Sequence, residues 1–160
     1  MARTQITAEP GVPQILITRE FDAARLLLFR AHIDPDLLVQ WLGPRWLTTT
    51  IDRFDPQDGG IWHYVHWDPE GGEYAFGGVF HGVPSLDGIV QTLEFEGRPD
   101  HVSLRTVTFT EHGSKTMLSQ NTVFQTVEDR DRELESGMGE EVEDSMERLD
   151  ELLARFTSVR

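Results

Sequence analysis

The last part of the chain constrains the fold more than any other feature. Between Gly137 and Phe156, apolar residues recur every three or four positions and acidic residues fill many of the gaps. The apolar positions are Met138, Val142, Met146, Leu149, Leu153 and Phe156. This spacing predicts an amphipathic helix of about five turns. Such a helix needs a second element to cover its apolar stripe, so the rest of the chain must supply a matching surface.

The stretch from Thr48 to Gln125 supplies such a surface. Its apolar and polar residues alternate with the period of two that is typical of strands. Turn sequences rich in Asp, Pro, Gly and Ser interrupt the alternation at residues 55–60, 68–72, 84–88, 97–100 and 111–114. We therefore expect six strands, each antiparallel to the one before it, in a meander.

One more strand and two short helices precede this stretch. A β-rich segment begins at Ile15 and brings the predicted number of strands to seven. Asp22 is the expected N-cap of a helix over residues 23–31. Asp34 is the expected N-cap of a second helix, in which Pro35 takes the first helical position because its missing N–H costs nothing there.

These elements predict an α+β fold in which a seven-stranded curved antiparallel sheet wraps around the long C-terminal helix. The two short helices after strand one are large enough only to plug one end, so we expect a cavity between the helix and the sheet. We assign residues 13–157 to this single ligand-binding domain. Residues 1–12 lack the apolar run of a secretory signal and are predicted to be a disordered leader.

The composition excludes several classes of protein. The chain has 14 Lys and Arg against 28 Asp and Glu, a formal charge of −14, and no cysteine. Without cysteine there is no disulfide, thiolate metal site or cysteine nucleophile. The negative charge disfavours nucleic acid and anionic membranes, which are bound chiefly through Lys and Arg. We expect a cytoplasmic monomer or homodimer with neither nucleic acid nor membrane as a partner.

Several short motifs, in a fixed order from Ile15 to Phe156, resemble a known family. They are Thr18-Arg19-Glu20-Phe21-Asp22-Ala23, Trp41-Leu42-Gly43-Pro44, Asp58-Gly59-Gly60-Ile61-Trp62, Gly77-Gly78-Val79-Phe80-His81 and Ser136-Gly137-Met138. The chain resembles the branch of the START-type helix-grip (SRPBCC) superfamily that contains activators of heat-shock-protein-90 ATPase and polyketide cyclase-like proteins. The resemblance implies the helix-grip fold, also called START or birch-pollen-allergen-like, with a ligand-holding cavity. The family commonly has Glu where Gly82 stands and often Gly-Trp where Gly137-Met138 stands, so these positions receive no family role.

The direction of each strand's side chains decides which residues face the cavity. In residues 89–96 the odd positions are mostly apolar and the even ones end in two glutamates, so the odd set is predicted to face inward. Carried through the turn at Pro84, this parity places His81 beside Gln91. If the turn at 111–114 is tight, Arg105 and Gln120, on the two strands that it connects, also face the cavity. The opposite parity of these two strands would bury Leu104 and Met117 instead.

This reasoning predicts an apolar and aromatic cavity with a few polar anchors. Without a ligand, the same aromatic side chains would simply fill the core. The predicted ligand-binding residues are Trp41, Trp62, Tyr64, His66, His81, Gln91, Leu93, Phe95, Arg105, Leu118, Gln120, Met138, Val142 and Met146.

Three functions are consistent with the sequence. The first is a non-enzymatic protein that binds a small hydrophobic or aromatic ligand in the cavity. The second is a cyclase or dehydratase-type enzyme, with His66, His81 and Arg105 as candidate catalytic residues that handle a proton. The third is a chaperone-activator-like interaction protein that uses the acidic outer face of residues 140–151. The histidine spacing matches no helical zinc site and no nucleotide-binding motif is present, so we predict neither metal nor cofactor.

Overall fold

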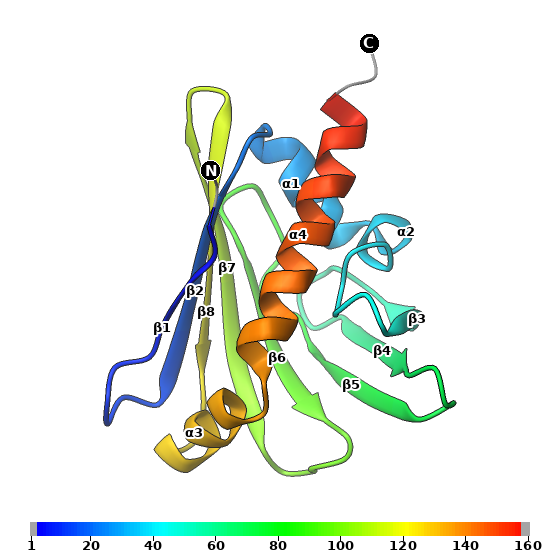
Figure 1. Cartoon of the computed structure of the whole chain (residues 1–160), viewed down its shortest axis with the longest axis vertical. Coiled ribbons are helices and arrows are strands. Elements are labelled where there is room, and N and C mark those ends of the chain that lie inside the picture. The colour runs from blue at the N-terminus through cyan, green and yellow to red at the C-terminus, as the bar shows by residue number, and fades with distance from the viewer. Residues whose placement is uncertain (1–2, 158–160) are drawn as a thin grey trace.

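The computed structural model describes residues 3–157, and a curved antiparallel sheet around one long helix dominates it (Figure 1). The strands follow one another in space in the order β1-β2-β8-β7-β6-β5-β4-β3. This arrangement confirms the predicted helix-grip fold. The strands are β1 (Gln5–Thr7), β2 (Gln14–Phe21), β3 (Thr48–Phe54), β4 (Ile61–Trp67), β5 (Glu73–Val79), β6 (Ile89–Phe95), β7 (Val102–His112) and β8 (Lys115–Val123). The helices are α1 (Arg25–Ile33), α2 (Pro35–Leu38), α3 (Val127–Glu135) and α4 (Met138–Thr157).

The helix α4 crosses the concave side of the sheet, with α1 and α2 near one end and α3 near the other (Figure 1). Its buried side chains include Leu149, Leu152 and Leu153, which belong to the main apolar core. The buried apolar face of α4 ends at Leu153. Phe156, which the sequence spacing placed on the same face, is 45% exposed. No helix within residues 3–157 combines the length and the apolar character that crossing a membrane requires.

A buried cation also holds α4 to the sheet. Arg19 of β2 is 5% exposed, and its Nη1 donates to Glu143 Oε1 of α4 over 3.0 Å. Its Nη2 lies 3.5 Å from Asp150 Oδ2, about two helical turns further along α4. The helix is therefore fixed along its length by ion pairs as well as by apolar packing.

Three predictions about the first half of the chain differ from the structure. The sheet has eight strands rather than seven, because β1 pairs with β2, and so the predicted disorder of residues 1–12 does not hold for Gln5–Thr7. The pairing is stabilised by Ile6, which packs on the cluster of Ile15, Ile17 and Met138. Residues 1–2 lie outside the described part of the chain.

The first helix begins at Arg25 with Ala24 as its N-cap, and the Asp22 side chain does not cap it.

The outer face of the sheet carries a histidine between two carboxylates. His63 of β4 lies 2.6 Å from Asp52 Oδ1 through Nδ1 and 2.6 Å from Glu96 Oε2 through Nε2. The hydrogen bond to Asp52, and then the one to Glu96, raise the pKa of His63 above its usual value. Because both nitrogens face acceptors, only the doubly protonated imidazole makes both bonds.

We expect the stabilising effect of His63 to depend on pH. A histidine whose pKa is raised by folding contributes stability below its unfolded pKa of about 6.5, and loses it as pH rises through the folded pKa. The free energy of unfolding should therefore differ between wild type and His63→Gln most at about pH 5.5 and least at about pH 9. The difference should stay below about 1 kcal/mol, because the group is partly exposed. Urea denaturation at each pH measures it, and a difference that grows with pH would contradict the account.

Candidate functional site

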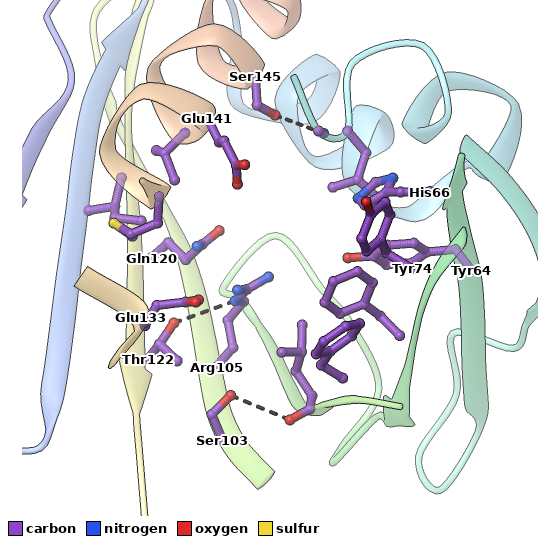
Figure 2. Close-up of a pocket in the computed structure, with 18 of the residues that line it drawn as sticks. Tyr64, His66, Tyr74, Ser103, Arg105, Gln120, Thr122, Glu133, Glu141 and Ser145 are labelled. Atoms are coloured by element: carbon purple, nitrogen blue, oxygen red, sulfur yellow. Dashed lines mark hydrogen bonds between the residues drawn. The ribbon is translucent and has the colours of Figure 1, made fainter. Parts of the chain in front are cut away.

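A cavity of about 940 Å³ lies between α4 and the concave face of the sheet. Ligand sites for small molecules typically measure about 300–1,000 Å³. Figure 2 shows that the cavity has two unlike walls, one lined by aromatic side chains and the other by polar ones. The two walls come from different parts of the sheet, and each follows from the strand register.

Strands β4, β5 and β6 build the aromatic wall. Alternate residues of a strand share one face, and the register places Tyr64 opposite Phe76 and Phe76 opposite Phe95. The rings of Tyr64 and Phe76 stack with centroids 5.4 Å apart, and those of Phe76 and Phe95 with centroids 5.0 Å apart. Trp62 stacks on Tyr64 at 5.4 Å. The wall is thus a continuous row of stacked rings, each tilted by 22–29° from the next, which gives this side of the cavity an aromatic, apolar lining.

Strands β7 and β8 and the helices α3 and α4 build the polar wall. Arg105 Nε donates to Thr122 Oγ1 over 3.5 Å, and its guanidinium extends into the cavity (Figure 2). Gln120 lies beside it on β8, and the carboxylates of Glu133 and Glu141 point into the same space from the two helices. Burial, and then the charge of Glu133, raise the pKa of Glu141 above its usual value.

His66 lies at the end of the aromatic wall with a defined tautomer. Thr49 Oγ1 is 3.2 Å from the carbonyl oxygen of Leu42 and 2.8 Å from His66 Nδ1. A carbonyl only accepts, so the hydroxyl proton goes to Leu42 and His66 Nδ1 donates to the hydroxyl oxygen. Burial, with a smaller effect of the Arg148 charge, lowers the pKa of His66 to about 4. At neutral pH the ring is therefore uncharged and its Nε2 is an acceptor.

A second enclosed histidine, His32 of α1, also lines the cavity. Its Nδ1 donates to the carbonyl oxygen of Leu28 over 2.8 Å, which leaves Nε2 as a buried acceptor without a hydrogen-bond partner. Burial, with a smaller effect of the Arg105 charge and against the hydrogen bond to Leu28, lowers the pKa of His32 to about 4. The indole N–H of Trp62, whose side chain is 2% exposed, is likewise buried without a partner. Unsatisfied buried groups of this kind are uncommon in native proteins.

The loop from Trp41 to Leu47 closes the cavity over His66. Ser145 Oγ of α4 donates to the carbonyl oxygen of Trp41 over 2.9 Å, and Arg148 Nη1 to that of Gly43 over 2.6 Å. Gly43 has a φ of +85°, and a Cβ there would lie 2.9 Å from His66 Cε1. The loop is thus fastened to α4 and packs directly on the histidine.

At the other end, α3 is fastened to the connection between β6 and β7. Asp129 of α3 accepts a hydrogen bond from His101 Nδ1 at 2.9 Å and lies 3.2 Å from Arg98 Nη2. All three side chains line the cavity. This contact places α3, and with it Glu133, beside the polar wall.

The structure brings most of the predicted site residues to this cavity. The ones that line it are Trp41, Trp62, Tyr64, His66, Gln91, Leu93, Phe95, Arg105, Gln120, Met138, Val142 and Met146. Two do not line it. Leu118 has the predicted inward direction, but it is 1% exposed and belongs to the filled apolar core.

The placement of His81 was wrong. Phe80 rather than His81 pairs with Gln91, so the residue that faces inward at this point is Phe80. His81 is exposed and lies away from the cavity. The predicted inward face of β6 was right. The predicted register between β6 and the end of β5, however, was off by one residue, because the irregular connection at residues 80–88 pairs Phe80 with Gln91. A register shift of one residue moves every side chain to the opposite face of the sheet.

Sequence reasoning missed His32, Glu133 and Glu141 as cavity residues. The only sequence signal for α3 was its dense acidic run, which lacks an apolar stripe, and so nothing placed Glu133 inside. Glu141 lies one position before the apolar Val142, where the helix pattern favours the solvent side. Among residues 3–157, no group of three or more His, Asp or Glu side chains is arranged to hold a metal ion.

Comparisons with known proteins agree with this geometry. The sequence model of the family described as Activator of Hsp90 ATPase homolog 1-like protein matches residues 22–154. A crystal structure of a protein from Rhodobacter sphaeroides is 27% identical, with a TM-score of 0.86 over 96% of this chain and 99% of that one. No curated protein sequence matches the chain.

Two more distant structures show the same fold. Protein Ms6760 from Mycobacterium smegmatis is 24% identical, with a TM-score of 0.85 over 94% of this chain and 97% of that one. CalU16 from Micromonospora echinospora is 16% identical, with a TM-score of 0.64 over 99% of this chain and 89% of that one. With its helix-grip architecture and a family match that spans most of its length, this chain belongs to the Activator of Hsp90 ATPase homolog 1-like family of the SRPBCC superfamily.

Proposed function

We propose that this protein binds a small aromatic or largely apolar molecule in the cavity between α4 and the sheet. The observation that carries the proposal is the unfilled volume of about 940 Å³ under α4. Protein interiors are ordinarily packed as densely as organic crystals, so a hollow of this size costs stability unless something occupies it. A bound molecule would recover the lost contacts.

The lining supports an aromatic ligand in particular. The row of stacked rings from Trp62 through Tyr64 and Phe76 to Phe95 makes one side of the cavity aromatic and apolar. Apolar surface that a ligand and the cavity remove from water contributes about 25 cal/mol per Å² to the binding free energy, and offset stacking of aromatic rings adds to this contribution. The polar wall opposite gives such a ligand an orientation.

A double substitution that fills the cavity from both sides should strongly weaken binding. In Leu93→Trp/Val142→Trp, indole rings extend from β6 and from α4 into the same hollow, since both parent residues line it. We expect the affinity for the fluorescent probe hydroxypyrene, measured by anisotropy, to fall at least tenfold. The matched control is Leu104→Trp/Val123→Trp. These two residues lie opposite each other on β7 and β8 and are both exposed, so the new rings lie on the outer face of the sheet.

The control should bind the probe as wild type does, and circular dichroism should show that both variants are folded. Equal binding by all three proteins would contradict the proposal, because the probe would then be attached elsewhere on the surface.

A cyclase or dehydratase-type activity in the same cavity is the second candidate. His66, with an unprotonated Nε2, and Arg105 line one space, as that activity requires, whereas His81 does not. A group whose pKa is lowered to about 4 is a weak base at neutral pH, however, and efficient general bases have pKa values near the working pH. This favours binding over catalysis. If the protein were such an enzyme and converted a bound ligand, His66→Gln would abolish the reaction and leave the affinity for that ligand unchanged.

A chaperone-activator-like interaction through the acidic face of α4 has less support. Several of those carboxylates are already paired inside the molecule: Arg45 contacts Asp144 and Glu151. Arg19 contacts Glu143 and Asp150. Such internal pairing reduces the charge available to a basic partner.

A further inference from the structure

We propose that the ligand carries a hydroxyl group that lies between Arg105 and Glu133, accepting from the guanidinium and donating to the carboxylate. This assignment rests on the proposed binding function and names the chemical group that the cavity selects. It follows from polar atoms that face the hollow without a protein partner.

Arg105 is a cation with unused donors. Its only hydrogen bond within residues 3–157 is the long one from Nε to Thr122 Oγ1, and no carboxylate in that part of the chain forms an ion pair with it. The terminal nitrogens lie in the cavity (Figure 2). A guanidinium carries five N–H donors in a planar fork, so several of them remain for a ligand.

Glu133 is a carboxylate of the same polar wall and lines the cavity together with Arg105. Figure 2 shows its side chain reaching from α3 toward Arg105. Both charges act on the Tyr64 hydroxyl: burial raises the pKa of Tyr64 to about 12, the charge of Arg105 opposes this and that of Glu133 adds to it. Both side chains line the same cavity, and among the described residues they form no direct ion pair with each other. A hydroxyl group suits such a pair, because its oxygen accepts from a guanidinium while its proton is donated to a carboxylate.

Other unpartnered atoms in the cavity point to an oxygenated ligand. The Trp62 indole N–H is a buried donor that lacks an acceptor, and His32 Nε2 is a buried acceptor that lacks a donor. Both side chains line the same hollow. A purely hydrocarbon ligand would displace water from these groups and leave them unsatisfied, which costs free energy. A ring compound with hydroxyl groups can satisfy them.

The charges in the cavity favour a neutral hydroxyl over a carboxylate. Glu133 and Glu141 both face the space beside Arg105, so a ligand anion bound to Arg105 would be repelled by two carboxylates. A neutral hydroxyl makes the same contact with Arg105 without that repulsion and gains a second bond to Glu133. The whole chain, with its charge of −14, also repels anions at long range.

Three matched probes test the assignment: pyrene, hydroxypyrene and pyrenecarboxylate, titrated into the full chain at about pH 6.5, where a phenol-type hydroxyl keeps its proton. We expect hydroxypyrene to bind at least about tenfold more tightly than pyrene, since a hydrogen bond to a charged group is worth at least that factor. Pyrenecarboxylate should bind more weakly than hydroxypyrene. A merely apolar site would instead favour pyrene, which is the least polar of the three.

Variants assign the effect to the two residues. In Arg105→Met the preference for hydroxypyrene over pyrene should vanish, while pyrene itself still binds. Glu133→Gln should reduce the same preference and strengthen the binding of pyrenecarboxylate. Glu135→Gln, an exposed position of the same helix that does not line the cavity, should behave as wild type.

Two results would overturn the assignment. Equal binding of pyrene and hydroxypyrene would mean that water rather than a ligand hydroxyl bridges the pair, and tightest binding of pyrenecarboxylate would mean that Arg105 takes an anion. Either result leaves the proposed ligand-binding function standing. If none of the three probes binds, the proposed function itself is wrong.

Discussion

Replacing Leu149 with alanine is expected to lower the free energy of unfolding by about 3–5 kcal/mol. Leu149 is 0% exposed, lies in the middle of α4 and belongs to the core cluster that joins this helix to Phe21 of β2 and Leu28 of α1. Truncation removes the transfer free energy of the side chain and leaves a void that a rigid helix cannot close. Since a domain is stable by only about 5–15 kcal/mol, this is a large fraction of the total. Urea denaturation followed by tryptophan fluorescence measures the change.

The matched control is Phe156→Ala, about two turns further along the same helix. Phe156 was expected in the apolar stripe but is 45% exposed, so its truncation should cost less than about 1 kcal/mol. Similar losses at the two positions would contradict the account of how α4 is held on the sheet.

Replacing Gly78 with alanine should have a comparable effect through a different mechanism. A Cβ at Gly78 of β5 would collide with the backbone carbonyl of Thr92 on β6 and lie 3.0 Å from Cε2 of Trp62. Neither backbone can move without separating β5 from β6, which together carry Phe76 and Phe95 of the aromatic wall. We expect a loss of at least about 3 kcal/mol in the free energy of unfolding. Hydroxypyrene should also bind more weakly, because the aromatic wall is disturbed.

The adjacent Gly77→Ala is the control for this prediction. A Cβ there meets the side chain of His63 at 3.2 Å on the outer face, and a side chain can shift where a backbone carbonyl cannot. Its cost should remain below about 1 kcal/mol, and ligand binding should be unchanged. If both variants were equally destabilised, the close approach of β5 and β6 would not be the cause.

The parts of the fold with a strong period were predictable from the sequence. The spacing of apolar residues located α4, and the alternation from Thr48 onward located β3 to β8 with their antiparallel order. The inward set of β6, Ile89 with Gln91, Leu93 and Phe95, was also right, because glutamates mark its other face.

Elements without a period were not predictable. The strand β1 has only three residues and one apolar side chain, so its pairing with β2 leaves no alternation to detect. The helix α3 is almost entirely polar, and a polar run of that kind is equally typical of an exposed surface. His81 was misplaced because strand parity does not survive an irregular connection, and Phe80 took its place.

The candidate site shows the same division. Residues whose direction follows from strand parity, such as Tyr64, His66 and Arg105, were placed in the cavity correctly. Those brought there by tertiary packing, such as His32 and Glu133, were not. The size of the cavity depends on how far α4 stands from the sheet, and no local sequence pattern reports that distance.

The methionines provide the most direct test of the central claim, that the hollow under α4 accepts a ligand. Met138 and Met146 line the cavity, whereas Met117 lies on β8 at a position that does not. In a sample labelled with carbon-13 at the methionine methyl groups and titrated with hydroxypyrene, the Met138 and Met146 resonances should shift and show cross-relaxation to the ring protons. The Met117 resonance should remain in place. A shift confined to Met117, or no shift of Met138 and Met146 when the probe is bound, would contradict the account.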